Sequence, residues 1–121
     1  MPSHIHFVAR QLDGKLNETI RYFKAHVAKQ ALHLIESEPG ESRKLWLLHM
    51  FRYYAKFQQQ NSKYQFWQKT SHPIEMLSPK MLMQKIDYIH NNPVAASLVI
   101  DPASWLYSSA CRISPFTVVR I

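Results

Sequence analysis

The chain is poor in glycine and cysteine and has no long apolar run, and each shortage excludes a class of protein. Its 121 residues include two glycines, so no glycine-rich loop is available to cradle a nucleotide phosphate. The single cysteine, Cys111, cannot form an intrachain disulfide, which fits a reducing compartment. No segment approaches the roughly 20 apolar residues that cross a bilayer, and no secretory signal is visible at the N-terminus. We therefore expect a soluble, cytoplasmic protein built as one domain.

Acidic residues are also scarce. Eight Asp and Glu stand against fifteen Lys and Arg, which gives a formal net charge of +7. Such an excess attracts polyanions over long distances, so nucleic acid is the natural partner. A generic basic surface without a specific partner would have the same composition, and composition alone does not decide between the two.

Two stretches in the first half of the chain have apolar side chains at the three- and four-residue spacing typical of amphipathic helices. The first spans residues 17–37, and the second begins near Ser42, after the break at Pro39 and Gly40. Packing against a core accounts for the apolar stripe of the second helix, which consists of Trp46, Leu47, Met50, Phe51, Tyr54 and Phe57.

A third helix is predicted over residues 79–91. Ser78 can accept a hydrogen bond from a free amide of the first turn, and proline suits the first helical position. Pro93 disfavours helix at Asn92 and is expected to end the helix there.

Short segments favour strand. In residues 4–9 alternate side chains point to opposite faces of an extended chain, so His4 and His6 share one face. Residues 64–67 and 74–77 are two further short extended pieces. The sequence thus predicts a mixture of helices and strands.

Tyr88 lies on the polar side of the third predicted helix. A helical wheel places Gln84, Lys85 and Asn92 within about 60° of Tyr88, because residues three and four apart are neighbours. This grouping requires that the last helical turn survives Pro93.

Together these side chains could perform phosphoryl chemistry. Two imidazoles and an amide oxygen can hold a divalent cation that polarises a phosphate, and a tyrosine hydroxyl can then attack phosphorus. Each element taken singly is unspecific, since a His-x-His pair is more often incidental and a tyrosine at a helix rim is usually an amphipathic surface residue.

Four segments, in this order and spacing, resemble the REP-associated, insertion-sequence-200-like tyrosine transposases, whose signature is a histidine pair around a hydrophobic residue. They are residues 2–7, 66–68, 87–94 and 105–110, and the most specific is YIHNNPV at 88–94. The resemblance covers nearly the whole chain.

The resemblance implies a function and a set of site residues. Tyr88 would be the nucleophile that cuts and rejoins single-stranded or hairpin DNA through a phosphotyrosine intermediate. His4, His6 and Asn92 would bind a divalent metal, Mg or Mn. The partners would be single-stranded or hairpin DNA and a second copy of the chain in a homodimer.

The resemblance also implies a fold. It is an α+β, ferredoxin-like domain, here incomplete and helix-rich, because the chain starts at the histidine strand and lacks the preceding strand, helix and strand. The transposase-like domain would span residues 1–110, followed by an atypical tail at 111–121. Two alternatives stay open, a catalytically inactive basic protein that binds DNA hairpins and a remnant whose histidines hold zinc or nothing.

Overall fold

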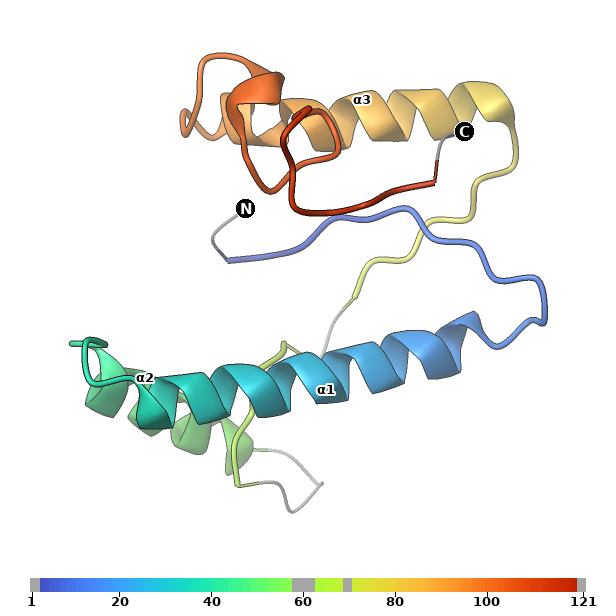
Figure 1. The fold of residues 1–121 in the computed structure, drawn as a ribbon. Helices are drawn as coiled ribbons and strands as arrows, with labels where there is room; N and C mark the ends of the chain where they lie inside the picture. The colour runs from blue at the N-terminus through green and yellow to red at the C-terminus, as the bar shows by residue number, and fades with distance from the viewer. Residues whose placement is uncertain (1–2, 58–62, 69–70, 120–121) are drawn as a thin grey trace. The chain divides into compact units, whose positions relative to one another are not determined.

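The computed structural model describes residues 3–57, 63–68 and 71–119. Figure 1 shows the helices α1 (Leu16–Ser37), α2 (Lys44–Ala55) and α3 (Pro79–Ala95), followed by the short 3-10 helix η1 (Pro102–Ser104). The three predicted helices are therefore confirmed, except for the predicted end of the third.

The chain divides into two compact units. The hairpin unit, Arg10–Pro73, contains α1 and α2, and the tyrosine unit joins Met1–Ala9 to Ile74–Ile121 and contains α3 and η1. Residues 111–119 belong to the tyrosine unit, and the ring of Phe116 lies 6.1 Å from that of Tyr107. The domain boundary expected at residue 110 stays a prediction.

The expected α+β, ferredoxin-like fold is wrong. Within the described ranges no residue forms a β-strand, and the segments 4–9, 64–67 and 74–77 are irregular. A strand is stable only where a neighbouring backbone supplies a ladder of hydrogen bonds, and local alternation of side chains cannot supply that neighbour. Within the residues that the structure describes, no helix is both long and apolar enough to cross a membrane.

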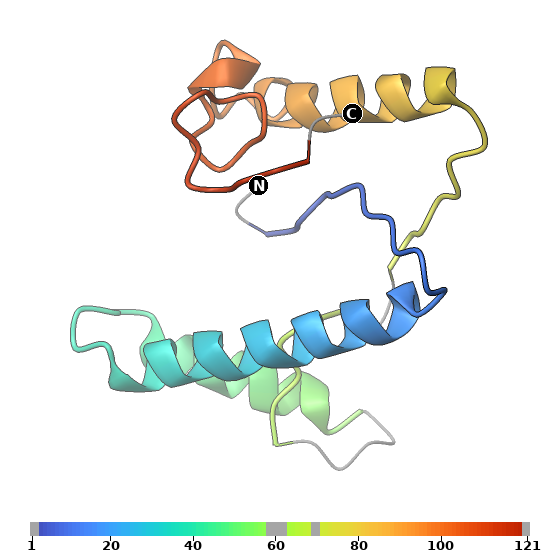
Figure 2. The ribbon, with the colours of Figure 1, turned by 45° about the vertical axis from the view of Figure 1, so that its right-hand side comes forward.

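The hairpin unit is built on the contact between α1 and α2, which lie side by side in Figures 1 and 2. On α2 the side chains of Leu48 and Ala55 are buried, and Leu47 and Phe51 are half-buried on the same side. Core packing therefore accounts for only part of the predicted stripe of α2. Three of its members are largely exposed to solvent: Trp46, Tyr54 and Phe57.

The segment 63–68 links the two helices of the hairpin unit by hydrogen bonds. The amide of Gln65 donates to the carbonyl of Phe51 at 3.0 Å, and the indole Nε1 of Trp67 donates to the carbonyl of Lys24 at 2.7 Å. Since Phe51 is on α2 and Lys24 is on α1, one short segment is bonded to both helices.

Tyr64 adds a polar link to the same segment. Its hydroxyl donates to Oε1 of Glu36 at 3.0 Å and accepts from Nη2 of Arg52 at 3.0 Å. The Arg52 guanidinium also lies 5.3 Å from the centre of the Tyr64 ring. Tyr64 thus connects the end of α1 to the last turn of α2.

In the tyrosine unit, α3 begins as predicted. Ser78 is extended, and its Oγ accepts a hydrogen bond from the amide of Met81 at 3.2 Å. Pro79 occupies the first turn, where its missing N–H is not needed.

The predicted end of α3 at Asn92 is wrong, because the helix continues through Pro93 to Ala95. Proline inside a helix removes one hydrogen bond and crowds the carbonyl four residues earlier. Side-chain amides next to the proline supply additional hydrogen bonds to backbone carbonyls of the preceding turn. Nδ2 of Asn91 donates to the carbonyl of Asp87 at 2.8 Å. Pro93 itself is buried, so packing favours its place in the helix.

A Schellman motif closes α3. The amide of Leu98 donates to the carbonyl of Pro93 at 2.9 Å, and that of Ser97 donates to the carbonyl of Val94 at 2.9 Å. Ser97 has a φ of 55°, in the left-handed region that a serine side chain enters at a cost.

Replacing Ser97 by glycine should therefore stabilise the protein. We expect Ser97→Gly to raise the free energy of unfolding by about 1 kcal/mol, because glycine adopts the left-handed conformation without steric penalty. Denaturant unfolding followed by circular dichroism measures this change. Ser97→Ala is the control and should bring no such gain, so equal stabilisation by both variants would contradict the prediction.

Candidate active site

Tyr88 lies on α3 with its side chain 59% exposed. Nζ of Lys85 lies 5.8 Å from the centre of the Tyr88 ring, and Nδ2 of Asn92 donates to the Tyr88 carbonyl at 3.5 Å. The helical spacing across Pro93 therefore survives, and Tyr88, Lys85 and Asn92 are neighbours as the wheel predicts. Gln84, the fourth member of that cluster, has no polar contact with the other three in the described part of the chain.

The two histidines lie together although their segment is not a strand. The ring centres of His4 and His6 are 4.8 Å apart, and the rings meet edge to face at 86°. Oγ of Ser3 is 3.1 Å from Nδ1 of His4. If Nδ1 carries the proton, Ser3 accepts it and Nε2 is left with a free lone pair.

The histidine pair lies beside the tyrosine. The ring of His6 is 6.0 Å from that of Tyr88, centre to centre, at 82°. Both residues belong to the tyrosine unit, so the fold of one compact unit brings them together. This contact between the N-terminal segment and α3 is the main feature of the candidate site.

The surroundings of His6 favour its neutral form. Partial burial lowers the pKa of His6 below the ordinary value of a histidine, and the neighbouring charge of His4 lowers it further. A neutral imidazole has the lone pair that a metal ion requires. Near neutral pH, His6 is thus held in the form that can act as a ligand.

The side chains fit a divalent cation in part. Two adjacent imidazoles supply nitrogen ligands, and Asn92, whose Nδ2 faces the Tyr88 carbonyl, keeps an amide oxygen whose lone pair can coordinate a cation. In the described ranges, no hydrogen bond joins Asn92 to His4 or His6, and no group of three His, Cys, Asp or Glu side chains adds a further ligand. Such a set would leave several positions for water or a phosphate.

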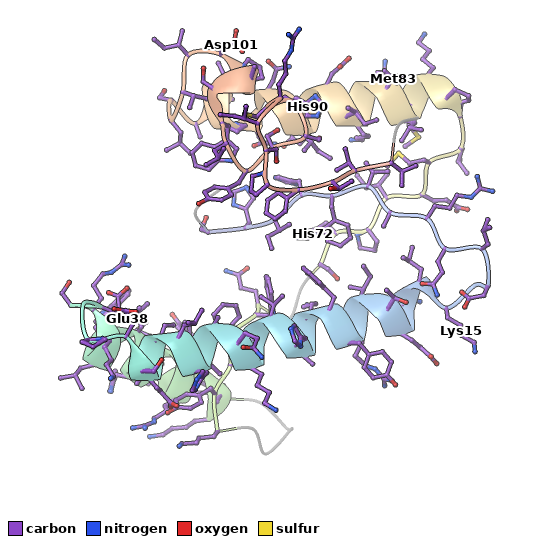
Figure 3. All side chains as sticks on the ribbon, viewed as in Figure 1. Lys15, Glu38, His72, Met83, His90 and Asp101 are labelled. Carbon is purple, nitrogen blue, oxygen red and sulfur yellow. The ribbon has the colours of Figure 1, made fainter. Side chains whose placement is uncertain are left out.

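His90 takes part in a contact that the sequence did not indicate. Its Nε2 lies 2.8 Å from Oγ of Ser109, which ties the segment after η1 to α3. Figure 3 labels His90 on α3 and Asp101, whose carboxylate accepts from the amide of Ala103 at the start of η1. The signal in the sequence was that His90 and Ser109 belong to two of the segments that carry the family resemblance, but nothing linked them to each other.

Comparison with known proteins adds no family. No protein-family model matches the chain, and no curated protein and no solved structure shows significant similarity to it.

The lowered pKa of His6 should be visible in solution. In a pH titration followed by NMR of the histidine rings, we expect His6 to protonate at lower pH than an ordinary histidine, because burial and the charge of His4 oppose its cationic form. His4→Gln removes that charge and should move the pKa of His6 upward. His33→Gln, a change on α1, is the control and should leave His6 unaltered.

Proposed function

We propose that the chain is a DNA strand-transferase of the tyrosine transposase type, in which Tyr88 is the nucleophile. One observation carries the proposal: the rings of His6 and Tyr88 are 6.0 Å apart within one compact unit. The resemblance makes the first a metal ligand and the second the nucleophile. The short distance between the two rings supports a site in which an imidazole pair and a phenol act on the same phosphate.

The chemistry would follow from the exposed phenol. The Tyr88 hydroxyl gives up its proton to water, its oxygen attacks phosphorus to form a new O–P bond, and the P–O bond to the neighbouring sugar breaks. The departing sugar oxygen takes up a proton and becomes a free hydroxyl, while the phosphotyrosine keeps the energy of the broken ester. Attack by a DNA hydroxyl reverses these steps and rejoins the strand without ATP.

Lys85 supports the attacking group. Its ammonium lies 5.8 Å from the centre of the Tyr88 ring, close enough to stabilise negative charge on the phenolate. A cation at this position also attracts the phosphate that is to be attacked. Lys85 would thus help to bring both reactants together.

His4, His6 and Asn92 would hold the metal, which when bound supplies positive charge that polarises the scissile phosphate. Mg²⁺ prefers oxygen ligands, whereas imidazole nitrogen suits transition metals better. We therefore expect Mn²⁺ to bind this set more tightly than Mg²⁺.

The proposed partner is single-stranded or hairpin DNA. The net charge of +7 and the exposure of Tyr88 support access by a polyanion. The homodimer implied by the resemblance belongs to the same proposal, and sedimentation of the purified chain measures it.

A second candidate is DNA-hairpin binding without catalysis. The irregular backbone of residues 4–9 favours it, because no ladder of strand hydrogen bonds fixes the histidines for chemistry. Under this alternative the positive charge of the chain would carry the binding, which would weaken steeply with salt.

The nucleophile can be tested directly. Incubation with labelled single-stranded hairpin DNA and Mn²⁺, followed by denaturing electrophoresis, should give a covalent protein–DNA band. Tyr88→Phe should abolish the band while leaving hairpin affinity within about twofold, because it removes the attacking oxygen but little of the positive charge. Tyr107→Phe is the matched control, since Tyr107 is an exposed tyrosine of the same unit.

Absence of a band from the folded, metal-bound parent would count against catalysis. Hairpin binding that persists in that case would favour the second candidate. Equal loss of the band in Tyr88→Phe and Tyr107→Phe would show that neither tyrosine is a specific nucleophile.

The metal site has its own test. We expect the double change His4→Gln and His6→Gln to weaken Mn²⁺ binding by about tenfold or more, because it removes both nitrogen ligands. Titration calorimetry measures the affinity, and His26→Gln with His33→Gln on α1 is the control. Unchanged Mn²⁺ affinity in the first variant would place the metal elsewhere.

A further inference from the structure

Helix α2 has a second ring-bearing face that the core of the hairpin unit does not use. The core face consists of Leu48 and Ala55, with Leu47 and Phe51 beside them. On the opposite side, an outer aromatic row is formed by Trp46 and Tyr53 of α2 and by Phe57 in the turn that follows the helix, and these residues are 60%, 47% and 66% exposed.

The row follows from helical spacing. Trp46 and Tyr53 are seven residues apart, which at 100° per residue places them within about 20° of one another. Phe57 follows Tyr53 by four residues, in the turn after the helix. The rings of Tyr53 and Phe57 touch edge to face with centres 5.1 Å apart. At 1.5 Å per residue the row is about 16 Å long, which gives room for a few stacked bases.

A basic row runs beside the aromatic row. His49, Arg52 and Lys56 follow each other at steps of three and four residues, and all three are exposed. The sequence of α2 contains no acidic residue to neutralise them. Arg52 uses one nitrogen on the hydroxyl of Tyr64 and keeps further N–H groups for an anion.

The segment 63–68 reaches this face at Arg52, which contacts Tyr64. The other two rings of the segment are half-buried and engaged elsewhere, with Phe66 5.4 Å from Phe51 and Trp67 bonded to the carbonyl of Lys24 on α1. The rings of the outer aromatic row therefore stay exposed to a ligand.

We propose that the outer face of α2 binds single-stranded nucleic acid, with bases stacked on Trp46, Tyr53 and Phe57 and phosphates along Arg52 and Lys56. Charge favours this occupant over a second copy of the chain, because two such faces in contact would oppose basic rows of the same sign. Rings, unlike aliphatic side chains, offer flat surfaces on which any base can stack.

The inference shares its class of partner with the proposed function but uses neither Tyr88 nor the histidines. It assigns binding of the DNA strand to the hairpin unit and cutting of the DNA strand to the tyrosine unit. If the chain binds DNA but never cuts it, the proposed function is contradicted and this inference is not.

The test compares two oligonucleotides with the full chain. Fluorescence anisotropy is measured in EDTA, which prevents cutting, with a labelled oligo-dT and with an abasic oligonucleotide of the same number of phosphates. We expect oligo-dT to bind about tenfold or more tightly than the abasic strand, because only oligo-dT can stack. Oligo-rU shows whether the face distinguishes DNA from RNA, and similar binding is expected since stacking does not read the sugar.

Matched variants then locate the binding face. Trp46→Ala and Phe57→Ala should each weaken oligo-dT binding by about fivefold or more, whereas Trp46→Phe should stay within about threefold because it keeps a ring. Leu45→Ala is the control for the loss of exposed apolar area, since Leu45 is 84% exposed on the same helix, in line with the basic row, and carries no ring. Lys56→Ala should lower the salt slope of binding by about 0.7, and Lys29→Ala on α1 should not.

Three results would overturn the proposal. One is equal binding of oligo-dT and the abasic strand, and another is equal loss in Leu45→Ala and Trp46→Ala. The third is binding of phosphatidylserine vesicles, but of no oligonucleotide, through Trp46, which would make the face a membrane-surface site. Circular dichroism of each variant confirms that α-helix is retained, so that lost binding is not lost folding.

Discussion

The candidate site depends on the passage of α3 through Pro93. If the helix ended at Asn92, the amide of that residue would leave the face on which Tyr88 lies. Instead, side chains of Asn91 and Asn92 donate to carbonyls of the preceding turn, and the Schellman motif closes the helix after the proline. A proline inside a helix ordinarily costs about 3 kcal/mol. Here the burial of Pro93, the added donors and the closing motif accompany it.

Two different kinds of packing hold the two units. In the hairpin unit, helix contacts are reinforced by one segment whose backbone, indole and phenol bond to both helices. In the tyrosine unit, the tie between His90 and Ser109 and the contact between α3 and η1 hold the C-terminal segment on α3. Among the residues that the structure describes, few are buried in either unit, so directed polar contacts carry much of the specificity of the fold.

The proposed division of labour follows from this organisation. Cutting would use side chains that come from two distant parts of the sequence, the N-terminal segment and α3. Holding would use one face of a single helix and the turn after it, where a row of exposed rings lies beside a row of exposed basic side chains. The first arrangement depends on tertiary contacts, whereas the second needs only a helix whose opposite side is anchored.

The sequence by itself determined the helices and the local cluster on α3. Apolar spacing predicts α1 and α2, the serine and proline at 78 and 79 predict the start of α3, and helical periodicity predicts that Tyr88, Lys85 and Asn92 are neighbours. These features depend on residues close in the chain, whose geometry the helix fixes. Only the tertiary structure decided that residues 4–9 are not a strand, because pairing requires a second backbone that local pattern cannot reveal. It also decided that His6 lies beside Tyr88 and that one face of α2 stays exposed, since both depend on which distant segments pack together.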